Sequence, residues 1–306
     1  EKDNTENKES DKEAGKEADA VTYTCPSCGA QIVTDATTAA TFCYYCHNPV
    51  VLGGRLEGKF LPDQVIPFSV SREDAEKGFK DYVCKKKFVP RAFYNKKQVE
   101  SITGVYFPYW HYNTRLEGKM QGEARNVRVW RTGNTEYTET KYYQVSREGD
   151  VKLENLTENA LGKANQELIC GVMPYDFKDV KKFQLGFLSG FLAEKRDIEK
   201  KQIEKKVQQE ARESAEKLMR EQINGYSSVS VKNADFRALK EKWSYTLLPV
   251  WTITYKAKNG KIYYFSMNGQ TGKVYGELPT DYKKISLVSG IVSLVTLVIL
   301  LLGGLA

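Results

Sequence analysis

Apolar and polar positions divide this chain of 306 residues into regions with different patterns. Residues 1–20 are mostly charged and contain no aromatic residue, which predicts a disordered acidic segment. Residues 285–306 contain no charged residue at all. Between these ends, the spacing of apolar residues predicts the strands and helices of a folded body.

The first part of the body reads as a strand, a helix and a set of aromatic strands. Residues 65–68 predict a short strand, and a helix is expected from Ser71 to about residue 87, with Asp74 in the capping-box position. An aromatic strand follows over residues 103–113. Alternating residues then predict two strands joined at residues 132–134, and residues 147–150 predict a further turn.

The second part of the body repeats this order. Residues 172–175 are similar to residues 66–68, and residues 247–251 are similar to 106–110, since both end in Pro-x-Trp. We interpret this as an internal duplication with halves at residues 55–168 and 169–281; the alternative is a chance likeness between aromatic strands. Asn268 and Gly269 predict a hairpin turn, because Asn-Gly suits a turn with positive φ.

A long polar helix is expected over residues 187–223, which contain no proline and many good helix formers. Its thin apolar stripe needs a covering surface. The helix therefore either lies on its own domain or pairs with a partner. The stripe consists of Ile203, Val207, Ala211, Ala215, Leu218 and Ile223.

Four of the six cysteines form two C-x-x-C pairs within residues 21–54. The pairs are separated by 14 residues, a spacing typical of a zinc ribbon, in which four thiolates close a tetrahedral shell around one ion. A closed shell indicates a structural Zn²⁺ rather than a catalytic one. The predicted metal ligands are Cys25, Cys28, Cys43 and Cys46, while His47 is a poor fifth candidate and His111 is expected to be a packed residue.

The apolar C-terminal region predicts a transmembrane anchor over residues 282–306. As a helix, its 22 uncharged residues would measure about 33 Å, against a hydrocarbon core of about 30 Å. Lys283 and Lys284 precede the uncharged run, so the positive-inside rule places the N-terminal body in the cytoplasm.

The expected fold class is therefore α+β: a zinc ribbon, an antiparallel-sheet body of two similar halves with packed helices, and a transmembrane helix. Composition is ordinary for a folded protein, with 41% hydrophobic and 28% charged residues. The net charge is +7, and it is +11 without the eight acids and four lysines of residues 1–20. A basic body fits an anionic membrane surface or nucleic acid equally well.

Several segments together resemble a known family. They are the cysteine pairs, the Pro-x-Trp strands, residues 187–194 and residues 268–272. The chain resembles bacterial membrane proteins of the YdjG type, described as TFIIB-type zinc-ribbon or primosomal-helicase (PriA)-like proteins. Helicase activity is not expected, because the ATPase motifs are missing. The resemblance implies a membrane-tethered accessory protein of phage-shock or SPFH-type membrane-stress scaffolds.

The expected function is that of a non-enzymatic, single-pass membrane adaptor or scaffold with cytoplasmic protein partners. No catalytic motif of known spacing is found, and no small-molecule substrate is identified. The alternative is a nucleic-acid-binding ribbon protein at the membrane. Residues 21–54 contain no lysine or arginine, however, and phosphate contacts require them, so nucleic acid is the less favoured partner. An enzyme site between the two halves is a third hypothesis.

Overall fold

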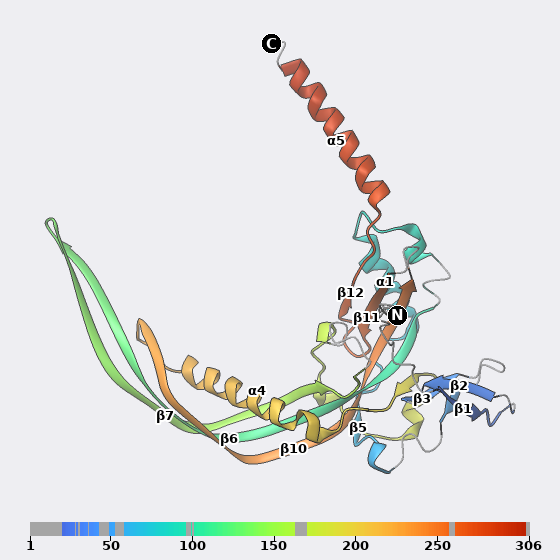
Figure 1. Ribbon diagram of the computed structural model, residues 1–306, viewed down its shortest axis with the longest axis horizontal. Coiled ribbons are helices and arrows are strands. Elements are labelled where there is room, and N and C mark those ends of the chain that lie inside the picture. Colours follow the sequence, from blue (N-terminus) through green and yellow to red (C-terminus); the bar gives the residue numbers. More distant parts are fainter. Residues whose placement is uncertain are drawn as a thin grey trace, which may run out of the picture.

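The computed structural model describes residues 20–27, 29, 31–35, 37–42, 49–52, 58–95, 99, 101–162, 170–256 and 261–303. Its main feature is a ten-stranded mixed sheet, from which three very long strands curve away as an arm (Figure 1). A long helix lies on the inside of this curve, and the C-terminal helix leaves the body by itself (Figure 1).

Four short strands open the described chain: β1 (Ala20–Thr24), β2 (Gln31–Asp35), β3 (Thr38–Phe42) and β4 (Pro49–Val51). β1 and β2 form a separate two-stranded sheet, whereas β3 pairs with β4 and with β9 (Leu192–Glu194) in the main sheet. The expected fold is corrected here. Instead of closing a separate zinc ribbon, β3 belongs to the sheet of the body, and its Ala39 and Ala40 are buried in the main core.

The main sheet is built around β6 (Thr103–Thr132), β7 (Thr135–Asn159) and β10 (Ser228–Lys256). β6 pairs antiparallel with both β7 and β10 over most of its length. However, β5 runs parallel to β10, and β9 runs parallel to β6, so the sheet is mixed. The other strands are β5 (Gln64–Val65), β8 (Lys181–Lys182), β11 (Ile262–Asn268) and β12 (Val274–Gly276).

The expected antiparallel sheet is wrong, because the sheet is mixed and joins strands from both proposed halves. The two Pro-x-Trp segments are neighbours in one sheet, where Tyr106 pairs with Pro249 and Trp110 pairs with Tyr245. Each segment is buried by pairing with the other, so strands from both parts of the sequence share one core. The domain boundaries proposed from the sequence are not tested by this arrangement and stay predictions.

Two of the three turns predicted from the sequence are present in the structure. β6 ends at Thr132 and β7 begins at Thr135, which confirms the hairpin turn between them. The turn after Asn268 is also confirmed, because Asn268 Oδ1 accepts hydrogen bonds from the amides of Gln270 and Thr271, both at 2.9 Å. The turn at residues 147–150 is wrong: β7 continues through Gly149, which pairs with Gly118 of β6.

The helix α1 (Arg72–Cys84) confirms the predicted start at Ser71. Ser71 Oγ accepts a hydrogen bond of 3.1 Å from the Asp74 amide, as expected for an N-cap. Its apolar face packs in a cluster with residues from β10 and β11. The short 3₁₀ helices are η1 (Gly58–Phe60), η2 (Arg91–Tyr94), η3 (Phe177–Asp179) and η4 (Leu185–Leu188).

The helix α4 (Lys200–Glu221) covers the concave face of the arm. It begins later than predicted, because residues 187–199 form the end of η4, β9 and loops. Its buried side chains pack on β6, β7 and β10 with Leu116, Met120 and Phe236. The stripe is Ile203, Val207, Ala211, Ala215 and Met219, continued by Ile223, whereas the predicted Leu218 is 44% exposed. Of the two expectations, lying on its own domain is the one that the structure supports.

Close packing between α4 and the sheet depends on Gly118. A Cβ atom at this position would lie 2.6 Å from Met219 Sδ and 2.6 Å from the Phe236 ring, which is closer than van der Waals contact allows. The absence of a side chain at Gly118 therefore lets the last turn of α4 reach the sheet.

Truncating the helix side chain that contacts the sheet tests the observed stripe. Met219→Ala is expected to lower the free energy of unfolding by about 2–5 kcal/mol, because it leaves a cavity above Gly118. Leu218→Ala, one residue away on the exposed side, should change it by no more than about 0.5 kcal/mol. Urea unfolding of the full chain in detergent measures both values. Equal losses for the two variants would contradict the observed helix orientation.

Candidate functional site

The predicted zinc site is corrected by the structure. Of the four predicted ligands, only Cys25 is described; Cys28, Cys43 and Cys46, like His47, lie outside the described residues. Within the described ranges, no group of three or more His, Cys, Asp or Glu residues is placed to hold a metal ion. The Cys25 side chain is instead buried in a small apolar cluster with Val50 and Leu52. We therefore assign no zinc ion to the part of the chain that the structure describes.

His111 is a packed residue, as expected from the sequence. It lies in β6 with a 5% exposed side chain, and its ring stacks on Phe177 at 4.0 Å between centroids. His111 Nε2 lies 3.1 Å from Asn155 Oδ1, and Nδ1 lies 2.9 Å from Gln64 Nε2. A neutral ring with its proton on Nε2 satisfies both contacts. Burial lowers the pKa of His111 below its ordinary value of 6.5.

An aromatic cleft of about 790 Å³ opens where β3, β6, β9 and the start of α1 meet. Its wall contains Phe68 stacked on Phe191, with 4.1 Å between ring centroids and 5° between planes, and the neighbouring Trp251. Gly104 forms part of the same wall, where a Cβ atom would lie 2.6 Å from the Phe191 ring. The missing side chain thus leaves room for the stacked rings.

The described polar residues at the rim of this cleft are uncharged, except for one arginine. Ser69, Ser71, Ser101 and Thr103 contribute hydroxyl groups, and Arg72 is the charged side chain among the lining residues. Trp251 Nε1 donates a hydrogen bond of 3.1 Å to the Val70 carbonyl, which fixes the indole in the wall. An aromatic wall with a hydroxyl rim suits binding of an apolar side chain, because the rings supply contact area and the hydroxyls supply orienting hydrogen bonds.

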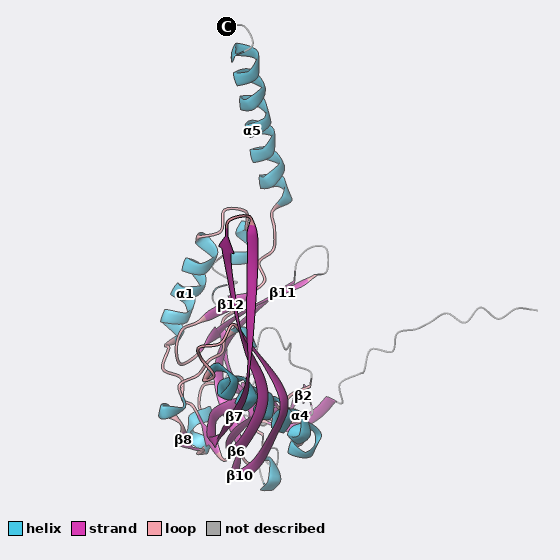
Figure 2. Cartoon of the chain, turned by 90° about the vertical axis from the view of Figure 1, so that its left-hand side faces the viewer, coloured by secondary structure: helices cyan, strands magenta, loops and turns pink. Residues whose placement is uncertain are grey.

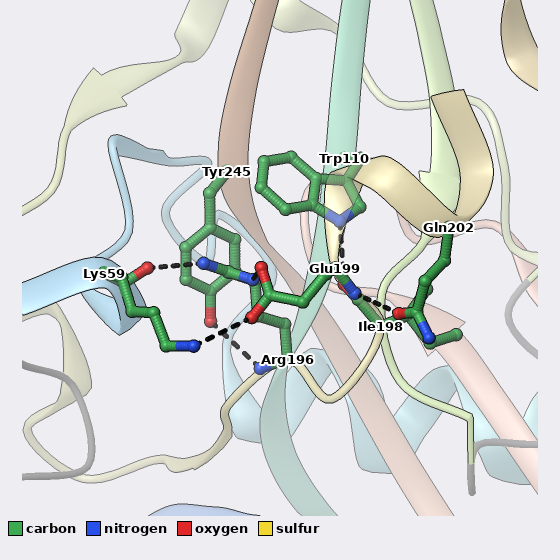
Figure 3. Close-up of polar contacts among 7 residues, drawn as sticks. All are labelled: Lys59, Trp110, Arg196, Ile198, Glu199, Gln202 and Tyr245. Carbon is green, nitrogen blue, oxygen red and sulfur yellow. Dashed lines mark hydrogen bonds and ion pairs between the residues drawn. The ribbon is translucent and has the colours of Figure 1, made fainter. Parts of the chain in front are cut away.

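Arg196 fixes the start of α4 against the body (Figure 3). Its side chain is 5% exposed and its guanidinium lies over the ring of Trp110, 4.8 Å from the centroid. It also donates a hydrogen bond of 2.6 Å to the Lys59 carbonyl and forms a 2.5 Å ion pair with Glu199. The hydrogen bond from Arg196 lowers the pKa of the Glu199 carboxyl.

The same contacts connect the helix start to both Pro-x-Trp strands. Trp110 Nε1 donates a hydrogen bond of 2.9 Å to the Ile198 carbonyl, and the Tyr245 hydroxyl accepts one of 3.3 Å from the Arg196 amide (Figure 3). Glu199 and Gln202 complete a capping box at the first turn of α4. The position of α4 on the arm is therefore set by β6 and β10, through residues that the sequence did not single out, apart from Trp110.

The helix α5 (Tyr282–Gly303) is the feature that could cross a membrane. Among the described residues, it is the one helix that is long and apolar enough, over Tyr282–Leu301, and none of that window is buried inside the protein. It projects from the body without packing against the rest of the chain (Figure 2). At its base, Lys284 Nζ donates a hydrogen bond of 2.7 Å to the Val89 carbonyl, so the helix begins against the body.

Comparison with known proteins gives one relative. The chain is 30% identical over 259 residues to the uncharacterized protein YdjG of Bacillus subtilis (strain 168), a match covering 83% of this chain and 76% of the relative. No family model matches the chain, and no solved structure matches it.

The buried neutral histidine makes the stability depend on pH. The folded chain binds a proton at His111 less readily than the unfolded chain does, so the free energy of unfolding should fall as the pH drops below about 6.5. It should keep falling until the pH passes the lowered pKa of the folded state. His111→Gln, which cannot titrate, should show a weaker dependence across this window. Parallel pH profiles for the two proteins in urea unfolding would contradict the assignment.

Proposed function

The chain belongs to the family of Bacillus subtilis YdjG, and from this premise we propose that it is a membrane-anchored adaptor, without enzymatic activity, that holds protein partners beside the bilayer. The observation that carries the proposal is the combination of α5 with an open aromatic cleft of about 790 Å³. The helix supplies the location, and the cleft supplies a surface for a partner.

The chemistry of the cleft favours binding over catalysis. Its described lining residues include one arginine and several hydroxyl groups, and none of them is a carboxylate, histidine or cysteine. General acid–base catalysis and covalent catalysis need such groups within reach of the substrate. Aromatic side chains in a partly open cleft are instead typical of sites that bury an apolar anchor residue of a partner.

Basic residues near the start of α5 support a cytoplasmic position of the body. Lys85, Lys86 and Lys87 line a hollow together with Leu278 and Pro279, just before α5, and Lys283 and Lys284 lie in its first turn. Lysines at this level attract the anionic lipids of the cytoplasmic leaflet and agree with the positive-inside rule. Partners of the phage-shock or SPFH type are part of this proposal on the strength of the family resemblance alone.

The proposed topology predicts a protection pattern. In spheroplasts, externally added protease should leave the body intact, because the bilayer shields it, and should digest it once the membranes are opened. Immunoblotting of the body measures both states. Digestion in sealed spheroplasts, with a cytoplasmic control protein still intact, would place the body on the opposite side.

Filling the cleft should remove partners without unfolding the protein. Ser69 is exposed at the rim of the cleft, and its backbone amide donates a hydrogen bond to the Gly269 carbonyl. Ser69→Trp should therefore block the cleft with a large side chain while this backbone hydrogen bond is kept. Ser146→Trp makes the same change at an exposed position of β7. In quantitative capture of the full chain from detergent-solubilised membranes, Ser69→Trp should lose partners that Ser146→Trp retains. Identical partner sets would count against the cleft as the binding surface.

A further inference from the structure

The end of the arm is a two-stranded ribbon. β10 begins at Ser228, which pairs with Arg125, so the β6–β7 hairpin continues past the third strand over residues 126–141. The ribbon ends in a tight turn at Gly133, whose φ of +61° suits glycine. No described helix or third strand pairs with this ribbon.

The ribbon exposes apolar and aromatic side chains near its tip. Trp130 is 41% exposed and Val129 is 55% exposed, and Val127 and Tyr137 are exposed as well. The rings of Trp130 and Tyr137, which face each other across the strands, stack with 5.6 Å between centroids and 14° between planes. Exposed apolar groups gathered on a projecting tip are unfavourable in water and indicate a contact surface.

Arginines accompany these rings. The Arg128 guanidinium lies 5.6 Å from the centre of the Trp130 ring, and Arg131 pairs with Glu136 at 3.2 Å. Over residues 126–141 the ribbon carries Arg128, Arg131 and Lys141 against Glu136 and Glu139, which leaves it net positive. Trp, Tyr and Arg together are typical of the boundary between lipid headgroups and acyl chains, where an amphipathic ring is half buried and a cation meets phosphate.

The shape of the arm brings this tip to the side of the body from which α5 leaves. Figure 1 shows β6 and β7 curving back toward that side, and Figure 2, turned by 90°, shows the same hairpin rising to the level at which α5 begins. A bilayer crossed by α5 would therefore meet the tip near the plane of its cytoplasmic headgroups. The inside of the curve, which would face this bilayer, carries α4 with seven basic and five acidic residues.

We propose that the β6–β7 tip is a second membrane contact, in which Trp130 and Tyr137 enter the headgroup region of the bilayer that holds α5 and Arg128 contacts lipid phosphate. This inference uses only the anchoring part of the proposed function. The arm would then lie along the membrane surface between its two contacts, α5 and the β6–β7 tip. Its length and curvature would set the angle between the body and the membrane.

Tryptophan fluorescence tests this contact directly. The chain has four tryptophans, of which Trp110 and Trp251 are buried and Trp243 is half-buried, so Trp130 is the one exposed indole. The full chain is reconstituted in vesicles of phosphatidylglycerol and phosphatidylcholine that contain a phosphatidylcholine with brominated acyl chains. Bromine quenches an indole at close range, so part of the fluorescence should be quenched in the wild type, and Trp130→Phe should abolish that part.

A matched reporter controls for quenching that is not specific to the tip. In the Trp130→Phe background, Tyr142→Trp places an indole at a more exposed position on the other face of the ribbon, five positions further from the turn than Tyr137, the partner of Trp130. That is about 17 Å along the strand, so this indole should stay unquenched. Quenching of the wild type no greater than that of Trp130→Phe would overturn the proposal and point to a protein contact instead.

Alkaline extraction of the same vesicles separates the two proposals. If the chain resists extraction but Trp130 is not quenched, the tip contact is contradicted, whereas the proposed anchor is not. A chain that is released at alkaline pH overturns both. The expected result is retention of the chain, together with a quenched Trp130 in the wild type and an unquenched reporter indole in the Tyr142→Trp variant.

Discussion

Backbone hydrogen bonds between β6 and β10 join residues 103–125 to residues 228–252, and most other elements take their place from this pairing. β7 adds to the far side of β6, and β11 adds to β10. The short parallel strands β9 and β5 attach to the same two strands. Because the paired residues of β6 and β10 are more than a hundred positions apart in the sequence, the sheet forms only when distant segments meet.

Different helices pack on the paired strands in different regions of the sheet. On the arm, the concave face is closed by α4, which is held at its start by Arg196 and at its end by the close approach of Met219 to Gly118. Nearer to α5, the packing is made by α1 with residues of β10 and β11, such as Trp251 and Phe265. Trp251 belongs both to this cluster and to the aromatic cleft, so this part of the cleft wall is held in place by close packing in the core.

Local signals in the sequence predicted local features well. The N-cap at Ser71, the turn at Asn268 and the uncharged run of α5 each depend on a few neighbouring residues, and each is found in the structure. The stripe of α4 was misassigned at its last turn, because Leu218 and Met219 both fit a helical spacing and only contact with Gly118 decides between them. The late start of α4 depends on the burial of Arg196, which is a tertiary effect.

The larger errors concern contacts between distant segments. The glycine-containing stretch around Gly149 has the composition of a turn, yet pairing with β6 carries β7 straight through it. The cysteine spacing suggested a self-contained zinc module, whereas β3, between the cysteine pairs, is part of the main sheet. The described lining of the cleft comes from five separated parts of the sequence: residues 41–42, 68–72, 101–104, 190–192 and 251. Gly104 lies in the predicted aromatic strand and Trp251 in the second Pro-x-Trp segment. No local pattern indicates that Phe68 and Phe191 stack beside them.

The projecting ribbon is the part of the arm with the least internal support. Two-stranded hairpins are marginally stable in water, and their free edges invite unwanted pairing. Here the stacked Trp130–Tyr137 pair and the ion pair between Arg131 and Glu136 stabilise the ribbon from within. These pairs stiffen the tip but leave its apolar side chains in water. A bilayer surface at the level of the first turn of α5 would cover them, and it would convert a curved sheet with one anchor into a scaffold fixed at both ends.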